Sequence, residues 1–130
     1  MAKRKPFHKN YKHEGGFVGL PCRVFNSEEY GALSLKARCL LDELQNLHRP
    51  GRNGRIGLSV SVAAKRMNVT RKTIKAGFDE LSDKGFIEES AGAYWRNGKA
   101  REWRLTYESY DGREPTDEWK ALGLKTVLEG

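Results

Sequence analysis

The 130-residue sequence lacks the features of several large functional classes. No window approaches the roughly 18 apolar residues that a transmembrane helix needs, and no apolar signal-peptide core follows the basic N-terminus. Cysteine is scarce: there are two, with no CxxC motif and no Cys/His pair at metal-ligand spacing, and the three histidines are scattered. We therefore expect a soluble cytoplasmic protein without a metal site.

Catalytic motifs are missing as well. The sequence has no P-loop, no GxSxG motif and no nucleophile next to a plausible base. A chain of this length forms one domain around a single small core, too small for a large catalytic scaffold. We predict that the protein is not an enzyme and requires no cofactor or small-molecule ligand.

The charge that is present is mainly positive. Lys and Arg number 24 against 17 acidic residues, a formal net charge of +7. Residues 1–107 carry 21 basic and 11 acidic residues, whereas residues 108–130 carry 3 basic and 6 acidic ones. Such a balance favours a polyanionic partner.

Composition divides the chain into an arm at 1–16, a domain at 17–107 and an extension at 108–130. The arm is basic and has little to form a core, so we expect it to be flexible. Lys3, Arg4 and Lys5 could lie along phosphates or in a minor groove, and a solvated tail explains the arm equally well. In the extension, Thr116 is the expected N-cap of a short helix. Its apolar residues would pack on the same domain or on a second subunit of a homodimer: Trp119, Leu122, Leu124 and Val127.

Three helices are expected between residues 35 and 84. Apolar residues at spacings of three and four follow Ser34, a good N-cap, and predict a helix over 35–48. Ser61 would cap a short helix over 62–67 that ends at Asn68, and Thr70 would cap a third helix over 71–84 closed by Gly85. A tight turn would separate the last two helices.

Three expectations concern the first third of the chain. Residues 17–25 contain apolar residues interrupted by Pro21, so we expect an extended segment there. Asn26 would then cap a helical turn through Tyr30, with Glu29 completing a capping box. Cys39, on the 35–48 helix, is expected to be a buried, reduced thiol.

The third helix has a basic outward face. A wheel of 100° per residue turns Ile74, Gly77, Phe78 and Leu81 inward. Near the start of the helix the wheel turns outward the residues that we predict to contact bases in a major groove: Lys72, Thr73, Lys75 and Ala76. Phosphate contacts are predicted for Arg71 at the helix start, for the Thr70 hydroxyl, and for Lys65 and Arg66 on the preceding helix. A basic run alone is usually only a solvated face, so the prediction depends on its combination with the capped helices and the strands.

Two strands follow the third helix. Residues 86–90 and 102–107 alternate in polarity, with Ile87, Trp103 and Leu105 predicted to point inward, and residues 56–59 could add a brief strand that pairs with this hairpin. The connecting loop at 91–101 carries Arg96, Lys99 and Arg101, which suit phosphates or a minor groove. Tyr94 and Trp95 in the loop would anchor it against the domain or stack on a base.

The stretch SVAAKRMNVTRKTIKAGFDELSDKGFIE, followed by EWRLT, resembles the winged helix-turn-helix superfamily of DNA-binding domains. It is similar to small helix-turn-helix proteins of bacterial plasmids, prophages and integrative elements. The resemblance implies an α+β fold in which a three-helix core carries a β-hairpin wing. It also implies sequence-specific binding of double-stranded DNA, with the 71–84 helix in the major groove and the 91–101 wing on the backbone or minor groove.

Within that resemblance several functions remain open. The expected one is a bacterial transcriptional regulator, located on the nucleoid when bound to DNA. The same surface would serve an accessory factor in the replication or excision of a mobile element. A winged helix used for RNA binding or protein–protein assembly is the other alternative. RNA recognition usually displays aromatic residues for stacking, for which only Tyr94 and Trp95 are candidates.

Overall fold

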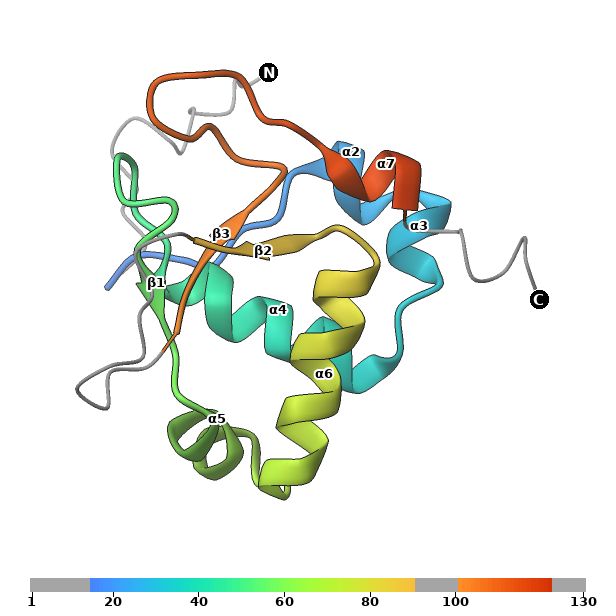
Figure 1. Ribbon diagram of the computed structural model, residues 1–130, viewed down its shortest axis with the longest axis vertical. Helices are drawn as coiled ribbons and strands as arrows, with labels where there is room; N and C mark the ends of the chain where they lie inside the picture. The colour runs from blue at the N-terminus through green and yellow to red at the C-terminus, as the bar shows by residue number, and fades with distance from the viewer. Residues whose placement is uncertain (1–14, 91–100, 123–130) are drawn as a thin grey trace, which may run out of the picture.

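The computed structural model describes residues 15–90 and 101–122 and shows a mixed α+β fold, as predicted (Figure 1). Its elements, in chain order, are α2 (Cys22–Phe25), α3 (Glu28–Gly31), α4 (Leu35–Leu47), β1 (Ile56–Gly57), α5 (Val60–Met67), α6 (Arg71–Asp83), β2 (Ile87–Glu89), β3 (Glu102–Leu105) and α7 (Glu118–Leu122). Each helix in these two ranges is too short or too polar to cross a lipid bilayer.

The sheet is antiparallel, with strand order β1-β3-β2. Ile56 pairs with Trp103, and Ile87 pairs with Leu105. This pairing confirms that a brief strand before α5 joins the hairpin strands. Because β1 lies beside β3, the chain leaves the sheet at Leu58 and enters α5 next to the start of β3.

Local capping chemistry sets the ends of the longer helices as predicted. The Ser34 hydroxyl accepts a hydrogen bond from the amide of Ala37 at the start of α4, and the Thr70 hydroxyl accepts one from the amide of Thr73 at the start of α6. Asn68 ends α5 in the left-handed conformation, with φ of 59°.

A glycine ends α6. Gly85 has φ of +83°, its N–H donates to the Ser82 carbonyl at 3.1 Å, and the N–H of Phe86 donates to the Leu81 carbonyl at 2.9 Å. This pair of hydrogen bonds is a Schellman motif, which satisfies carbonyls that the helix end would leave free. The chain then turns directly into β2.

The predicted start of α5 was wrong by two residues. Ser59, rather than Ser61, caps the helix, and its hydroxyl accepts a hydrogen bond from the amide of Val62 at 3.1 Å. Both serines have suitable side chains, so tertiary packing makes the choice. Leu58 is buried at the end of the sheet and Val60 packs against the core, which brings Ser59 to the turn between them.

The predictions for residues 17–30 were also wrong in part. The segment expected to be extended contains α2, which begins directly after Pro21, a residue whose fixed φ suits a helix start. Asn26 ends α2 instead of capping the next turn. Ser27 caps α3, with its hydroxyl accepting from the amide of Tyr30.

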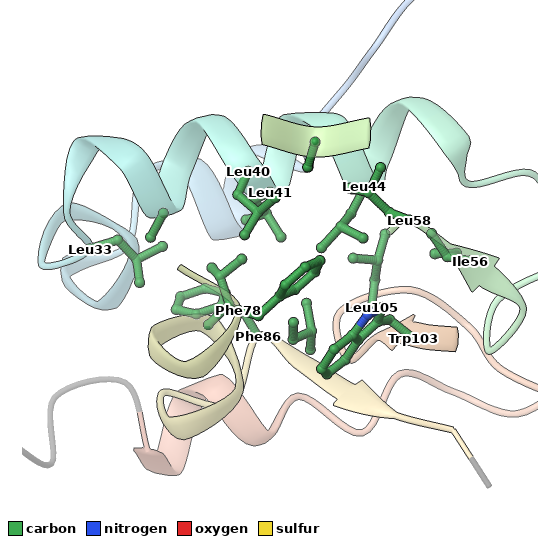
Figure 2. Close-up of a cluster of buried hydrophobic side chains, with 14 of the residues drawn as sticks. Leu33, Leu40, Leu41, Leu44, Ile56, Leu58, Phe78, Phe86, Trp103 and Leu105 are labelled. Carbon is green, nitrogen blue, oxygen red and sulfur yellow. The ribbon is translucent and has the colours of Figure 1, made fainter. Parts of the chain in front are cut away.

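The core lies between α4, α6 and the sheet (Figure 2). Phe78 of α6 stacks on Trp103 of β3 with ring centroids 5.0 Å apart. Gly77 faces α4 so closely that an added Cβ would lie 2.9 Å from Cδ2 of Leu40. The inward positions predicted for α6 and the hairpin strands are confirmed: Ile74, Gly77, Phe78, Leu81, Ile87, Trp103 and Leu105 are all buried.

Cys39 is exposed, although it was predicted to be buried. Cys22 is exposed as well. The buried side of α4 consists of Ala37, Leu40, Leu41 and Leu44. At 100° per residue, Cys39 lies about 150° from the centre of that face. The helix register therefore turns the thiol outward despite its apolar character.

The extension after β3 packs on its own domain. Trp119 of α7 is 3% exposed and stacks on Phe86, with centroids 5.8 Å apart. Thr116 does not cap α7 as predicted: its hydroxyl donates to the Glu118 carboxylate, and the amide of Lys120 donates to the carbonyl of Asp117. Leu122, the last residue of α7, is half-buried, and the other two expected apolar positions, Leu124 and Val127, lie outside the described residues.

Two buried polar residues that the sequence pattern does not reveal, Asn53 and Arg104, attach the loops to the sheet. Asn53 accepts a hydrogen bond from the Leu105 amide at 2.7 Å and donates to the carbonyls of Leu105, Glu108 and Ser109. Arg104, 5% exposed, lies on the opposite face of β3 from the core and binds Glu88 and Glu118. These contacts fix the strand that carries one side of the site described next.

Candidate nucleic-acid interface

The exposed side of α6 carries the predicted base-contact residues. Lys72, Lys75 and Ala76 are exposed. Thr73 is half-buried, and its hydroxyl lies 3.0 Å from that of Thr70. The first two turns of α6 thus present two lysine side chains and a small residue beside them to solvent.

A groove with a volume of about 570 Å³ lies beside this side of α6. We call it the basic groove. Its walls come from the segment between β1 and α5 with the start of α5, from one flank of α6, and from the start of β3 with the residue before it. Its lining residues are Leu58, Ser59, Val60, Ser61, Arg71, Lys75, Phe78, Asp79, Arg101 and Trp103.

Positive charge dominates the basic groove. Arg71 and Lys75 are one helical turn apart on α6, Arg101 lies directly before β3, and Asp79 is the one acidic residue among the lining residues. Phe78 and Trp103 contribute apolar surface between them. Cations grouped in a concave surface with low-dielectric walls focus positive potential there, which favours a phosphate-bearing ligand.

Arg101 is oriented by its neighbours. Its Nε lies 3.8 Å from Oε2 of Glu89, and its guanidinium lies over the Trp103 ring, 5.4 Å from the centroid. About half of the side chain remains exposed. An arginine held this way loses less side-chain freedom when it binds a phosphate.

The start of α5 forms another wall of the basic groove and was not predicted to be part of the site. Ser59 and Ser61 place hydroxyls there, and the Ser59 hydroxyl also accepts from the Val62 amide. The first turn of a helix presents amide N–H groups without intrahelical partners, at the positive end of the helix dipole. The signal that could have revealed this wall is Ser59 itself: with Ser59 as the N-cap, the sequence predicts that α5 begins just after the 56–57 strand.

The structure separates the other predicted phosphate contacts from the basic groove. Lys65 is exposed on α5, outside the groove lining. Arg66 turns toward α4, where its Nε donates to Oε1 of Glu43 at 2.6 Å. Thr70 uses its hydroxyl to cap α6. Of the predicted phosphate contacts in the described residues, Arg71 and Arg101 line the same groove. Lys75 of α6, predicted to contact a base, lines it as well.

Several predicted contacts lie outside the described residues. They are Arg96 and Lys99 of the wing, its aromatic pair Tyr94 and Trp95, and Lys3, Arg4 and Lys5 of the arm.

Within residues 15–90 and 101–122, no group of three or more His, Cys, Asp or Glu side chains could hold a metal ion.

Comparisons of the chain with protein-family models, with curated proteins and with solved structures find no match. The function proposed below therefore rests on the residues and geometry of this chain.

Proposed function

We propose that the protein is a sequence-specific double-stranded DNA-binding protein with winged helix-turn-helix architecture. In this assignment α4, α5 and α6 are the three-helix core, and β2 and β3 are the strands of the wing. The observation that carries the proposal is the position of the basic groove next to the exposed side of α6. One surface therefore combines candidate base contacts with candidate phosphate contacts.

The dimensions of α6 suit a major groove. Its 13 residues extend over roughly 20 Å, and a B-DNA major groove about 12 Å wide admits one α-helix. Lys72 can donate to guanine edges, and Ala76 allows close approach of the helix. We assign base contacts to Lys72, Thr73, Lys75 and Ala76.

Phosphates would lie on either side of that helix. We assign Arg71 and Arg101 to the sugar–phosphate backbone, where the guanidinium fork can bind two oxygens at once. Lys75 lines the basic groove as well as facing outward, so it can reach either a base or the adjacent phosphate. Arg96, Lys99 and Lys65 remain proposed phosphate contacts.

The biological role that we propose is transcriptional regulation in a bacterium. It rests on the similarity of the chain to small helix-turn-helix proteins of bacterial plasmids, prophages and integrative elements. A replication or excision factor would use the same surface, and the genomic location of the bound sites distinguishes the two roles.

A gel-shift comparison tests the choice of polymer. Random-sequence duplex DNA, single-stranded DNA and a structured RNA of equal length are titrated with the full chain at several salt concentrations. We expect the duplex to bind most tightly, with log affinity falling linearly with log salt. Tighter binding of RNA or single strands would contradict the proposal, as would no binding to any of the three.

Replacing Lys72 with alanine tests base recognition. After selection of preferred sites from random duplexes, we expect Lys72→Ala to cost about 1–3 kcal/mol on the selected site and much less on random DNA, because a base contact is lost. Lys84→Ala, at the far end of α6, is the matched control and should change neither. Equal losses on both DNAs would assign Lys72 to the phosphate backbone.

A further inference from the structure

One side of α4 forms an exposed stripe on a part of the molecule that shares no lining residue with the basic groove. We call it the α4 stripe: Leu35, Lys36, Cys39, Asp42 and Glu43. With Arg66, Met67 and Val69 these residues bound a shallow hollow of about 340 Å³. Leu35, the first residue of α4, is 74% exposed, more than the other exposed leucine of this helix, Leu47, at 42%.

Charge along the α4 stripe is balanced. Lys36 and Arg66 are basic and Asp42 and Glu43 are acidic, so the hollow has no net charge. A surface of this kind is poorly suited to nucleic acid or to any partner of a single charge sign. It suits a partner whose charges also alternate.

The order of these charges makes the α4 stripe complementary to itself. Lys36 lies three residues before Cys39 and Asp42 lies three residues after it, so each is about 4.5 Å from Cys39 along the helix axis. A two-fold axis through Cys39, perpendicular to α4, therefore brings Lys36 of one copy next to Asp42 of the other, twice. It also sets the two helix dipoles antiparallel.

We propose that the α4 stripe is an isologous interface between two copies of this chain, centred on Cys39. Arg66 holds the Glu43 carboxylate at 2.6 Å within its own copy, which leaves Asp42 as the acceptor for Lys36 of the second copy. The contact covers Leu35, and Met67 and Val69 add half-buried apolar surface at its edge. The residues of the basic groove stay free for another partner.

A charge-swap series tests the interface by sedimentation velocity, without DNA. We expect a concentration-dependent monomer–dimer equilibrium. Lys36→Glu or Asp42→Lys alone should raise the dimer dissociation constant at least about tenfold, because each places like charges together twice. The double variant restores opposite charges and should return to within about threefold of the original value.

Lys84→Glu, a charge reversal off the stripe, controls for net charge, and circular dichroism checks that each variant is folded. A monomer at all concentrations would overturn the proposal, as would single variants that dimerise normally or a double variant that is not restored. These measurements are independent of DNA binding, so their failure leaves the proposed function standing.

Chemical cross-linking gives a second measurement. A bis-maleimide with a short spacer should join two copies of the Cys22→Ser variant through Cys39, because both thiols lie at the two-fold axis. The Cys39→Ser variant retains Cys22, which is also exposed, and should remain uncross-linked. Equal cross-linking of the two variants, or none in either, would contradict a contact centred on Cys39.

Discussion

Replacing both Arg71 and Arg101 with alanine is expected to weaken the binding of duplex DNA by about 30-fold to 100-fold, without loss of the fold. Both arginines line the basic groove, Arg71 from the start of α6 and Arg101 from the position directly before β3. A 30-fold to 100-fold loss corresponds to about 2.0–2.7 kcal/mol in total, or about 1–1.4 kcal/mol for each arginine. This is just below the roughly 1.5–3 kcal/mol of a charge-assisted hydrogen bond, because both side chains are exposed to solvent.

Salt dependence identifies the kind of contact that is lost. Each lost phosphate contact removes about one released counterion, so the plot of log affinity against log salt should become shallower by about two in the double variant. The loss should be similar on preferred and random duplexes because phosphates carry no sequence information.

The matched control is the double variant Arg52→Ala and Arg113→Ala. Both arginines are exposed and neither lines the basic groove, so this pair removes the same net charge elsewhere. We expect less than about a fivefold loss from the long-range field alone. Equal losses in the two double variants, or an unchanged salt slope for Arg71 and Arg101, would show that DNA does not occupy the basic groove.

The second large effect concerns the fold. Gly85→Ala is expected to lower the free energy of unfolding by about 3 kcal/mol, from two sources that add. Gly85 has φ of +83°, where an alanine costs roughly 1–2 kcal/mol. An added Cβ would also lie 2.8 Å from the carbonyl carbon and oxygen of Glu118 and 2.9 Å from the amide nitrogen of Trp119. Those atoms are backbone, so α7 must move and the stacking of Trp119 on Phe86 must weaken.

Gly51→Ala separates these two sources. Gly51 has φ of +82°, nearly the same as Gly85, but its added Cβ would meet no atom within 4 Å. Urea unfolding of both variants should therefore show a loss of about 1–2 kcal/mol for Gly51→Ala and a larger one for Gly85→Ala. Equal losses would mean that α7 adjusts to the methyl group at no cost.

Local chemistry explains why so much of α4, α5 and α6 could be predicted. Ser34, Thr70, Asn68 and Gly85 act on the backbone within a few residues of themselves, so their effects can be read without knowledge of the rest of the molecule. The inward face of α6 follows from the same local periodicity. The expected basic outward face near its start follows with it.

Predictions failed where packing between distant segments chose among equivalent local options. Ser59 and Ser61 are equally good caps, and the burial of Leu58 against the sheet selected the first. The Cys39 prediction failed for a different reason: the local periodicity that turns Leu40 and Leu44 toward the core also turns Cys39 outward, whatever its apolar character. Asn53 looks like a turn residue in the sequence. It is buried because residues 105–109 pack against it, and its side chain makes four hydrogen bonds with their backbone.

The sequence by itself determined the capped starts of α4 and α6, the ends of α5 and α6, the two faces of α6 and the excess of positive charge, because these follow from neighbouring residues and composition. Tertiary structure alone decided that Arg71, Lys75 and Arg101 line one groove with the start of α5, and that Arg66 turns away toward Glu43. The reason is that β1 pairs with β3 across more than 40 residues of chain, and periodicity carries no information about such long-range pairing.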